Sequence, residues 1–191
     1  INGFYPTTPH LGVTMSLAIL SLLGCSGGAI TTIQVDFEGS TSVPGSDLLG
    51  QLTGALGFES FTNMDLTSSE ELENQGVEPG DIEEVYLTAF TLTVSDPDDG
   101  DLSFIESMSV SAETPEISPV VIADLAEFPE GESVVQFNLS DVDLTEYLVS
   151  ESMTLTTDVT GHQPEDDTTV VARVVLDVGV TLQGARNAAN R

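Results

Sequence analysis

The feature that most constrains the fold of this chain is a hydrophobic alternation of period two. Residues 33–38 alternate strictly between apolar and polar side chains, and the pattern returns in residues 102–112, 135–139, 153–159 and 170–182. Successive side chains of a β-strand point to opposite faces, so this alternation places one face in a core and the other in water. The chain is therefore predicted to form half-buried antiparallel strands.

Two further runs, residues 85–94 and 117–125, are apolar at both parities and are predicted to be buried strands. Turn-forming residues separate the runs in residues 96–100, 128–131 and 161–164, where Asp, Pro and Gly are frequent. Each of these turns is short enough for a hairpin or for a connection between two sheets.

These strands predict an all-β fold, an antiparallel β-sandwich of immunoglobulin-like architecture in one domain over residues 30–182. The cysteine and tryptophan hallmarks of true immunoglobulin domains are missing, so the likeness is one of architecture. Residues 183–191 are expected to form a frayed tail. The expected core contains Phe37, Phe90, Phe104, Val110, Phe137, Leu155, Val174 and Leu176.

One or two short helices are expected to interrupt the strands. Ser68 followed by Glu71 has the spacing of a capping box, and Gly76 suits a helix C-terminus. Residues 143–149 are expected to form one or two helical turns at the edge of the sandwich. Residues 39–64 are the hardest to interpret, because Leu48, Leu49, Leu52 and Leu56 have a helical spacing but Gly45, Gly50, Gly54 and Gly57 interrupt it.

The charge balance is extreme: 32 acidic residues stand against three arginines and no lysine, for a formal net charge of −29. Such a surface cannot neutralise phosphates, which excludes nucleic acid as a partner. Partners are expected to be neutral or cationic, either protein or glycan. Because the acids are spread along the whole chain and salt would relieve their repulsion, the composition indicates adaptation to a salty exterior. A generally acidic secreted protein in ordinary medium is the alternative.

The N-terminal region combines a short apolar run, residues 11–23, with Leu22-Leu23-Gly24-Cys25 and the flexible Ser26-Gly27-Gly28. This order resembles the signal of a bacterial lipoprotein, and the resemblance covers about the first 28 residues. It implies a signal segment at residues 1–24, a lipid on Cys25, and a tether at residues 25–29. The protein is then expected to be anchored to a membrane through this lipid.

A buried N-terminal helix with an unreactive Cys25 is the alternative, since a free cysteine often behaves as a small buried hydrophobe. However, Gly24 and Gly27-Gly28 would end such a helix abruptly, and the run is shorter than the roughly 20 residues that a membrane span needs. The lysine or arginine that opens such signals is missing from residues 1–14, so the sequence is expected to continue upstream.

Motifs that would indicate catalysis are missing from the sequence. His162 is the one histidine after Cys25, the sequence indicates no strained G-x-S-x-G elbow between a strand and a helix, and no P-loop, G-x-G-x-x-G or zinc-ligand spacing occurs. His162 is therefore expected to be an exposed turn residue. The protein is predicted not to be an enzyme, and no cofactor is expected.

One constellation does have the composition of a metal site. Asp96, Asp98, Asp99 and Asp101 surround Gly100, and closely spaced aspartates at a glycine turn can supply the oxygens that calcium needs. The spacing differs by one residue from that of an EF-hand loop. An ordinary acidic hairpin turn is the alternative, because turns favour the same residues.

The sequence thus predicts a lipid-anchored, non-catalytic structural or binding module outside the cytoplasm. Its location would be the outer membrane, the cell surface or the periplasmic face. The alternative function is that of a calcium-dependent adhesion or ligand-binding domain.

Overall fold

The computed structural model describes residues 31–46, 50–54, 56–62, 69–150 and 152–181, and every structural statement below concerns these residues. The predicted signal segment, Cys25, the tether and the C-terminal tail lie outside them.

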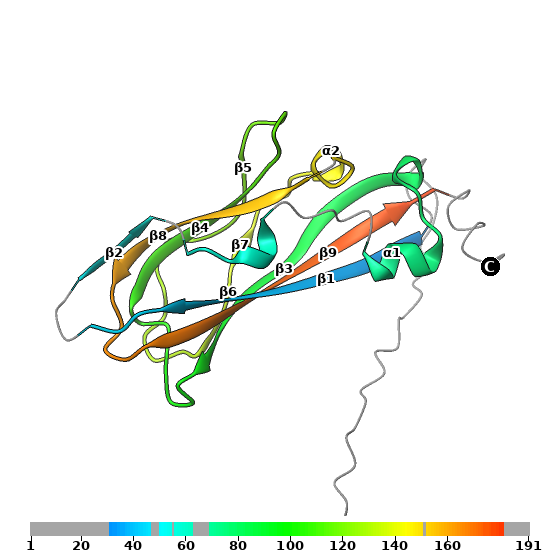
Figure 1. The fold of residues 1–191 in the computed structure, drawn as a ribbon. Helices are drawn as coiled ribbons and strands as arrows, with labels where there is room; N and C mark the ends of the chain where they lie inside the picture. The colour runs from blue at the N-terminus through cyan, green and yellow to red at the C-terminus, as the bar shows by residue number, and fades with distance from the viewer. Residues whose placement is uncertain (1–30, 47–49, 55, 63–68, 151, 182–191) are drawn as a thin grey trace, which may run out of the picture.

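The first sheet contains four strands in the order β1-β9-β3-β6 (Figure 1). They are β1 (Thr31–Val43), β9 (Thr168–Val180), β3 (Ile82–Asp96) and β6 (Val134–Gln136). The first and last strands of the domain therefore pair with each other, from Thr31↔Val180 to Val43↔Thr168 without interruption.

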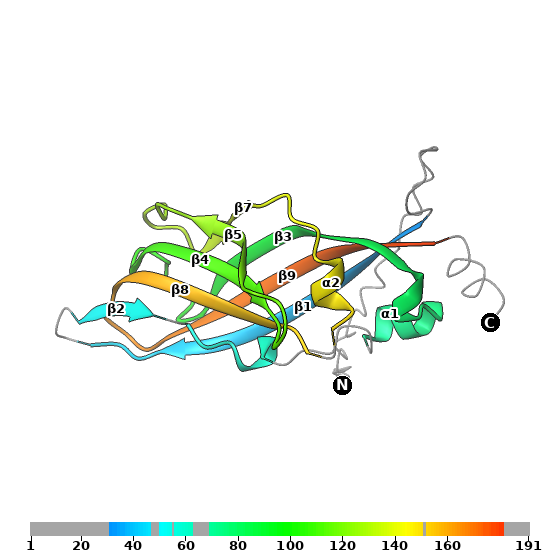
Figure 2. The same cartoon turned by 90° about the horizontal axis from the view of Figure 1, so that it is seen from above.

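The second sheet contains five strands in the order β2-β8-β4-β5-β7. They are β2 (Gln51–Gly54), β8 (Thr154–His162), β4 (Ile105–Glu113), β5 (Val120–Leu125) and β7 (Asn138–Leu139). This sheet lies over the first one (Figure 2), and every pair of neighbours in both sheets is antiparallel. The predicted all-β antiparallel sandwich is confirmed.

The likeness to immunoglobulin domains holds for the two-sheet architecture. In those domains the sheets have the strand sets ABED and CFG. Here the last strand, β9, lies inside its sheet between β1 and β3. The strand order is therefore different.

The alternation in the sequence explains the core. On β9 every even-numbered side chain from Val170 to Val180 is buried between the sheets. The predicted core residues that are buried are Phe90, Phe104, Val110, Phe137, Leu155, Val174 and Leu176. Phe37 is only partly buried, because it lies on β1 at the edge of its sheet, although it still packs against the core.

The open side of the sandwich next to β1 is closed by residues 56–62 and by α1 (Glu70–Gln75). Thr157 on β8 fixes this segment, since its hydroxyl accepts a hydrogen bond from the amide of Leu56 at 2.8 Å and donates one to the Leu56 carbonyl at 2.9 Å. Phe61, in the 3-10 helix η1 (Glu59–Phe61), packs directly on Gly39 of β1. The segment thereby covers part of an edge strand that would otherwise be open to other chains.

The predictions for the helices were partly wrong. In the stretch with the helically spaced leucines, Leu52 lies in strand β2, so the helical spacing does not reflect a helix there. Helix α1 begins one residue later than expected, with Ser69 as its N-cap, whose hydroxyl accepts from the Leu72 amide. Gly76 ends the helix in a left-handed conformation, as predicted.

Helix α2 (Thr145–Leu148) confirms the predicted turns at the sandwich edge, and Asp143 fixes it against β3. Desolvation raises the pKa of the Asp143 carboxyl, but three hydrogen bonds outweigh it and hold that pKa below its ordinary value. The hydroxyl and the amide of Thr145 donate two of them, and the amide of Val85 on β3 donates the third. The carboxylate thus accepts the hydrogen bond of a β3 amide that the carbonyl of a neighbouring strand would otherwise accept.

Candidate functional site

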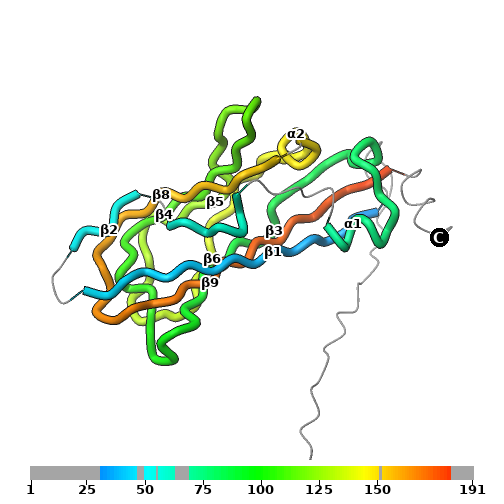
Figure 3. The backbone as a smooth tube through the Cα atoms, viewed as in Figure 1, coloured from blue at the N-terminus to red at the C-terminus, as the bar shows by residue number. Residues whose placement is uncertain are grey.

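Four connections between the two sheets meet at one end of the sandwich, at the left in Figures 1 and 3. These connections follow β1, β3, β5 and β8. The strand ends from which they leave lie close together, because Val43 pairs with Thr168, Asp96 with Thr169 and Thr93 with Val134. The start of β1 lies at the opposite end, and 13 strand residues place it about 40 Å away. We call the end formed by residues 44–46, 97–104, 126–133 and 163–167 the loop end.

The loop end is strongly acidic. Three of its segments, residues 97–104, 126–133 and 163–167, each contain three acidic residues and no basic one. The arginine that the structure describes, Arg173, lies in the middle of β9 and pairs with Asp36 on the exposed side of the first sheet. The loop end therefore has a concentrated negative charge with no basic side chain of its own.

Hydrogen bonds between the connections give the loop end a defined shape. The amide of Leu102 donates to the carbonyl of Glu132 at 2.9 Å, and the amide of Gly131 donates to the hydroxyl of Ser103 at 2.9 Å. On the other side, the amide of Gly45 donates to a carboxylate oxygen of Asp167 at 2.8 Å. The loops are thus joined to one another as well as to their strands.

Buried apolar side chains support the same end from below. Leu102, Phe104 and Phe128 come from two of the acidic connections, and all three point into the core. The ring of Phe128 packs edge-on against Phe137, with 5.7 Å between centroids. The acidic groups are therefore displayed on loops that are anchored by core residues.

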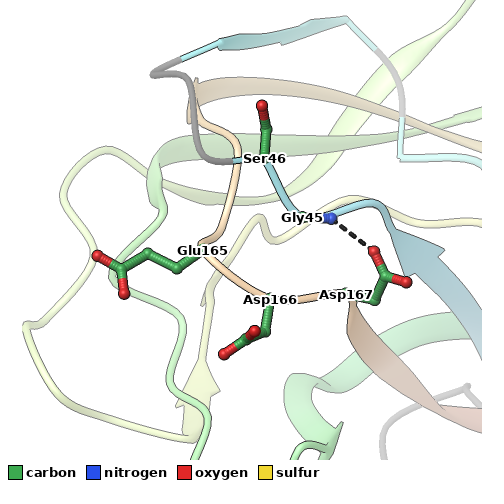
Figure 4. Close-up of a pocket in the computed structure, with 5 residues that line it drawn as sticks. All are labelled: Gly45, Ser46, Glu165, Asp166 and Asp167. Carbon is green, nitrogen blue, oxygen red and sulfur yellow. Dashed lines mark hydrogen bonds between the residues drawn. The ribbon is translucent and has the colours of Figure 1, made fainter.

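Two hollows open at the loop end. One has a volume of about 490 Å³ and is lined by Gly45, Ser46 and residues 165–167 (Figure 4). In Figure 4 the three acidic side chains point in different directions: only that of Asp167 turns toward Gly45. They do not converge on a common point.

The second hollow has a volume of about 360 Å³ and lies between the β3–β4 and β8–β9 connections. Asp99, Asp101, Glu165 and Asp166 line it together with His162. His162 is exposed, and its Nδ1 lies 3.1 Å from the carbonyl of Gln163, while its amide donates to the carbonyl of Phe104 at 2.8 Å. The structure thus places the exposed histidine near Asp99 and Asp101, which are about 60 residues away from it in the sequence.

The four aspartates of the predicted calcium site lie at or just after the end of β3. Asp96 is its last residue, and Asp101 accepts a hydrogen bond from the amide of Ser103 at 2.8 Å, a local turn contact. In the part of the chain that the structure describes, no three acidic, histidine or cysteine side chains are grouped so that they could hold a metal ion. Calcium binding therefore stays a prediction.

The sequence analysis did not predict that the three acidic connections lie together at one end of the sandwich. Each turn is visible in the sequence as a short stretch of Asp, Glu, Pro and Gly, but the stretches are about 30 residues apart. The role of Asp143 at the other end was also missed. Its only local sign is the Asp-x-Thr spacing with Thr145, which suits an Asx turn at a helix start.

Comparison of the chain with protein-family models and with curated proteins found no match. In the described residues, none of the helices has the length and apolarity needed to cross a bilayer.

Proposed function

We propose that this protein is a lipid-anchored, non-catalytic binding module that acts outside the cytoplasm and presents its loop end to a neutral or cationic partner. The observation that carries the proposal is the placement of the loop end. It lies at the opposite end of the sandwich from the start of β1, the strand that follows Cys25 in the chain.

Chain length supports this orientation. Five residues separate Cys25 from Thr31, and they span at most about 18 Å. A lipid on Cys25 would therefore hold the start of β1 near the membrane, and the length of β1 would place the loop end about 40 Å farther out. Several acyl chains are needed for stable anchoring, since each buried CH₂ contributes about 0.8 kcal/mol.

Charge complementarity indicates the partner. The acidic connections repel nucleic acids and anionic lipids and attract lysine- or arginine-containing segments, especially at low ionic strength.

Anchoring is tested by replacing Cys25 with Ser in the native host. The variant should move from the membrane fraction to the soluble fraction, while Ser26→Ala should leave the distribution unchanged. An unmodified thiol at Cys25 in the native protein, measured by mass spectrometry, would contradict the anchor.

Binding at the loop end is tested with a short oligolysine peptide as the probe. Replacing Asp98, Asp99 and Asp101 with Asn should weaken binding severalfold. The matched control replaces Glu70, Glu71 and Glu73 of α1 with Gln, which changes the net charge equally at the other end. Equal losses in both variants would mean that only net charge matters and that the loop end is not a site.

A further inference from the structure

We propose that Asn138 is an acceptor for a covalently attached glycan. Asn138-Leu139-Ser140 is the one Asn-x-Ser/Thr sequence in the 191 residues, and its middle residue is not proline. The inference rests on the proposed export of the chain from the cytoplasm. In exported proteins, such sequences are modified where they lie in surface-exposed segments.

The fold places Asn138 where a transferase could reach it. Strand β7 is the edge strand of its sheet and pairs only with β5, and Figure 2 shows it on the side of the sheet away from β2. Asn138 is opposite Asp124, which is opposite Ser109. Because cross-strand partners point to the same face, the Asn138 side chain lies on the outer face of the sheet, and it is exposed.

The reacting groups are also free of structural roles. Within the described residues, neither the Asn138 amide group nor the Ser140 hydroxyl makes a hydrogen bond, although the backbone amide of Ser140 donates to the carbonyl of Ile122 at 2.9 Å. Modification of Asn138 would therefore break no side-chain hydrogen bond among the described residues. Asn74 differs: it is exposed on α1, but Gly76 stands two residues later.

The reaction needs a sugar activated by a phosphate or pyrophosphate leaving group, carried on a lipid or a nucleotide. Nδ2 of Asn138 forms a bond to the anomeric carbon of the sugar while the bond from that carbon to the phosphate oxygen breaks. The phosphate leaves with the electron pair, and the proton that Nδ2 loses passes to a base of the transferase. The products are an N-linked sugar and the free phosphate of the carrier.

A glycan at this position would also protect the fold. The outer edge of β7 has no strand partner, and Leu139 beside it is 37% exposed. An exposed edge with apolar side chains is a site for unwanted strand pairing. A bulky, hydrated group on Asn138 would block the approach of a second chain.

The experiment uses protein isolated from its native host. The chain has no lysine and three arginines, so trypsin is unsuitable, whereas cleavage after glutamate releases residues 133–146 with Asn138 inside. The expected result is a mass increase on this peptide, localised to Asn138 by fragmentation. One hexose would indicate a nucleotide-linked donor, and an oligosaccharide would indicate a lipid-linked one.

Variants make the test specific. Asn138→Gln and Ser140→Ala should abolish the added mass completely, and Ser140→Thr and Asn74→Gln should retain it. An unmodified Asn138 peptide from membrane-bound protein would overturn the glycan proposal and leave the anchor intact. A soluble protein with a free Cys25 thiol would instead overturn the proposed function.

Discussion

Gly161, beside the loop end, leaves very little room for a side chain next to the neighbouring backbone, and replacing it with alanine tests how that end is held together. It lies on β8 opposite Ile105 of β4, at the point where the β3–β4 connection joins its strand. An added Cβ would be 2.2 Å from the carbonyl oxygen of Phe104 and 3.0 Å from the Cα of Ile105. Because both atoms belong to the backbone, no side-chain rotation can relieve the clash.

The cost follows from the movement that the Cβ would force. A carbon and an oxygen approach to about 3.3 Å in ordinary contacts, so the two strands must separate by roughly 1 Å. This weakens the hydrogen bond from the His162 amide to the Phe104 carbonyl, now 2.8 Å long, at a cost of about 1 kcal/mol. Overpacking adds about 1–3 kcal/mol. Gly161→Ala should therefore lower stability by about 2–4 kcal/mol.

For a domain of this size, that loss lowers the Tm by roughly 5–15 °C. The assay is thermal unfolding followed by circular dichroism at one fixed salt concentration. Gly57→Ala is the matched control, because no atom lies within 4 Å of its added Cβ, and its stability should change by less than about 0.5 kcal/mol. An unchanged Tm for Gly161→Ala would refute the close packing of the β3–β4 and β8–β9 connections.

Four further predictions follow from the same structure. Phe90→Ala should cost about 3–5 kcal/mol in a urea titration, because the ring is buried and packs edge-on against Phe137 with 4.9 Å between centroids. The Tm should rise between low and molar sodium chloride, since a net charge of −29 is set against one described ion pair, Arg173–Asp36; a flat Tm would contradict this. If the Asp96–Asp101 turn binds calcium, calcium should raise the Tm more than sodium at equal ionic strength, and Asp98→Asn should remove that extra rise; equal rises in both proteins would mean that the turn binds no calcium. The lowered pKa of Asp143 stabilises the fold above the carboxyl's unfolded pKa of about 3.9, and this contribution is lost as the pH falls through the folded pKa. Asp143→Asn should therefore reduce stability at pH 7 and flatten the acid limb of a Tm–pH profile, and an unaltered acid limb would count against this role.

The strands could be predicted because the pattern that specifies a strand lies within a few consecutive residues. A strand that buries one face needs apolar residues at every second position, and β9 shows this pattern from Val170 to Val180. The same rule explains why the leucine spacing in residues 39–64 is ambiguous. Leu48, Leu52 and Leu56 are four residues apart, a spacing that fits one face of a helix and also one face of a strand. Leu52 lies in β2, so the strand periodicity held there.

The loop end could not be predicted, because its assembly depends on strand pairing over long distances in the sequence. Val43 meets Thr168, and Asp96 meets Thr169, only once the sandwich has formed. Each acidic turn by itself resembles an ordinary turn, since Asp, Pro and Gly are favoured there for conformational reasons. What distinguishes these turns is that the fold brings three of them to the same end.

The proposed anchor and the acidic surface act together on orientation. Repulsion between the domain and an anionic membrane is screened beyond about 8–10 Å at physiological ionic strength. It would therefore act on the carboxylates near the start of β1, such as those in the first turn of α1, and leave the loop end unaffected at about 40 Å. With a tether of at most about 18 Å, this repulsion disfavours the domain lying flat on the membrane. The same charge that is predicted to limit the stability of the sandwich would thus keep its loop end turned outward, where a cationic partner could reach it.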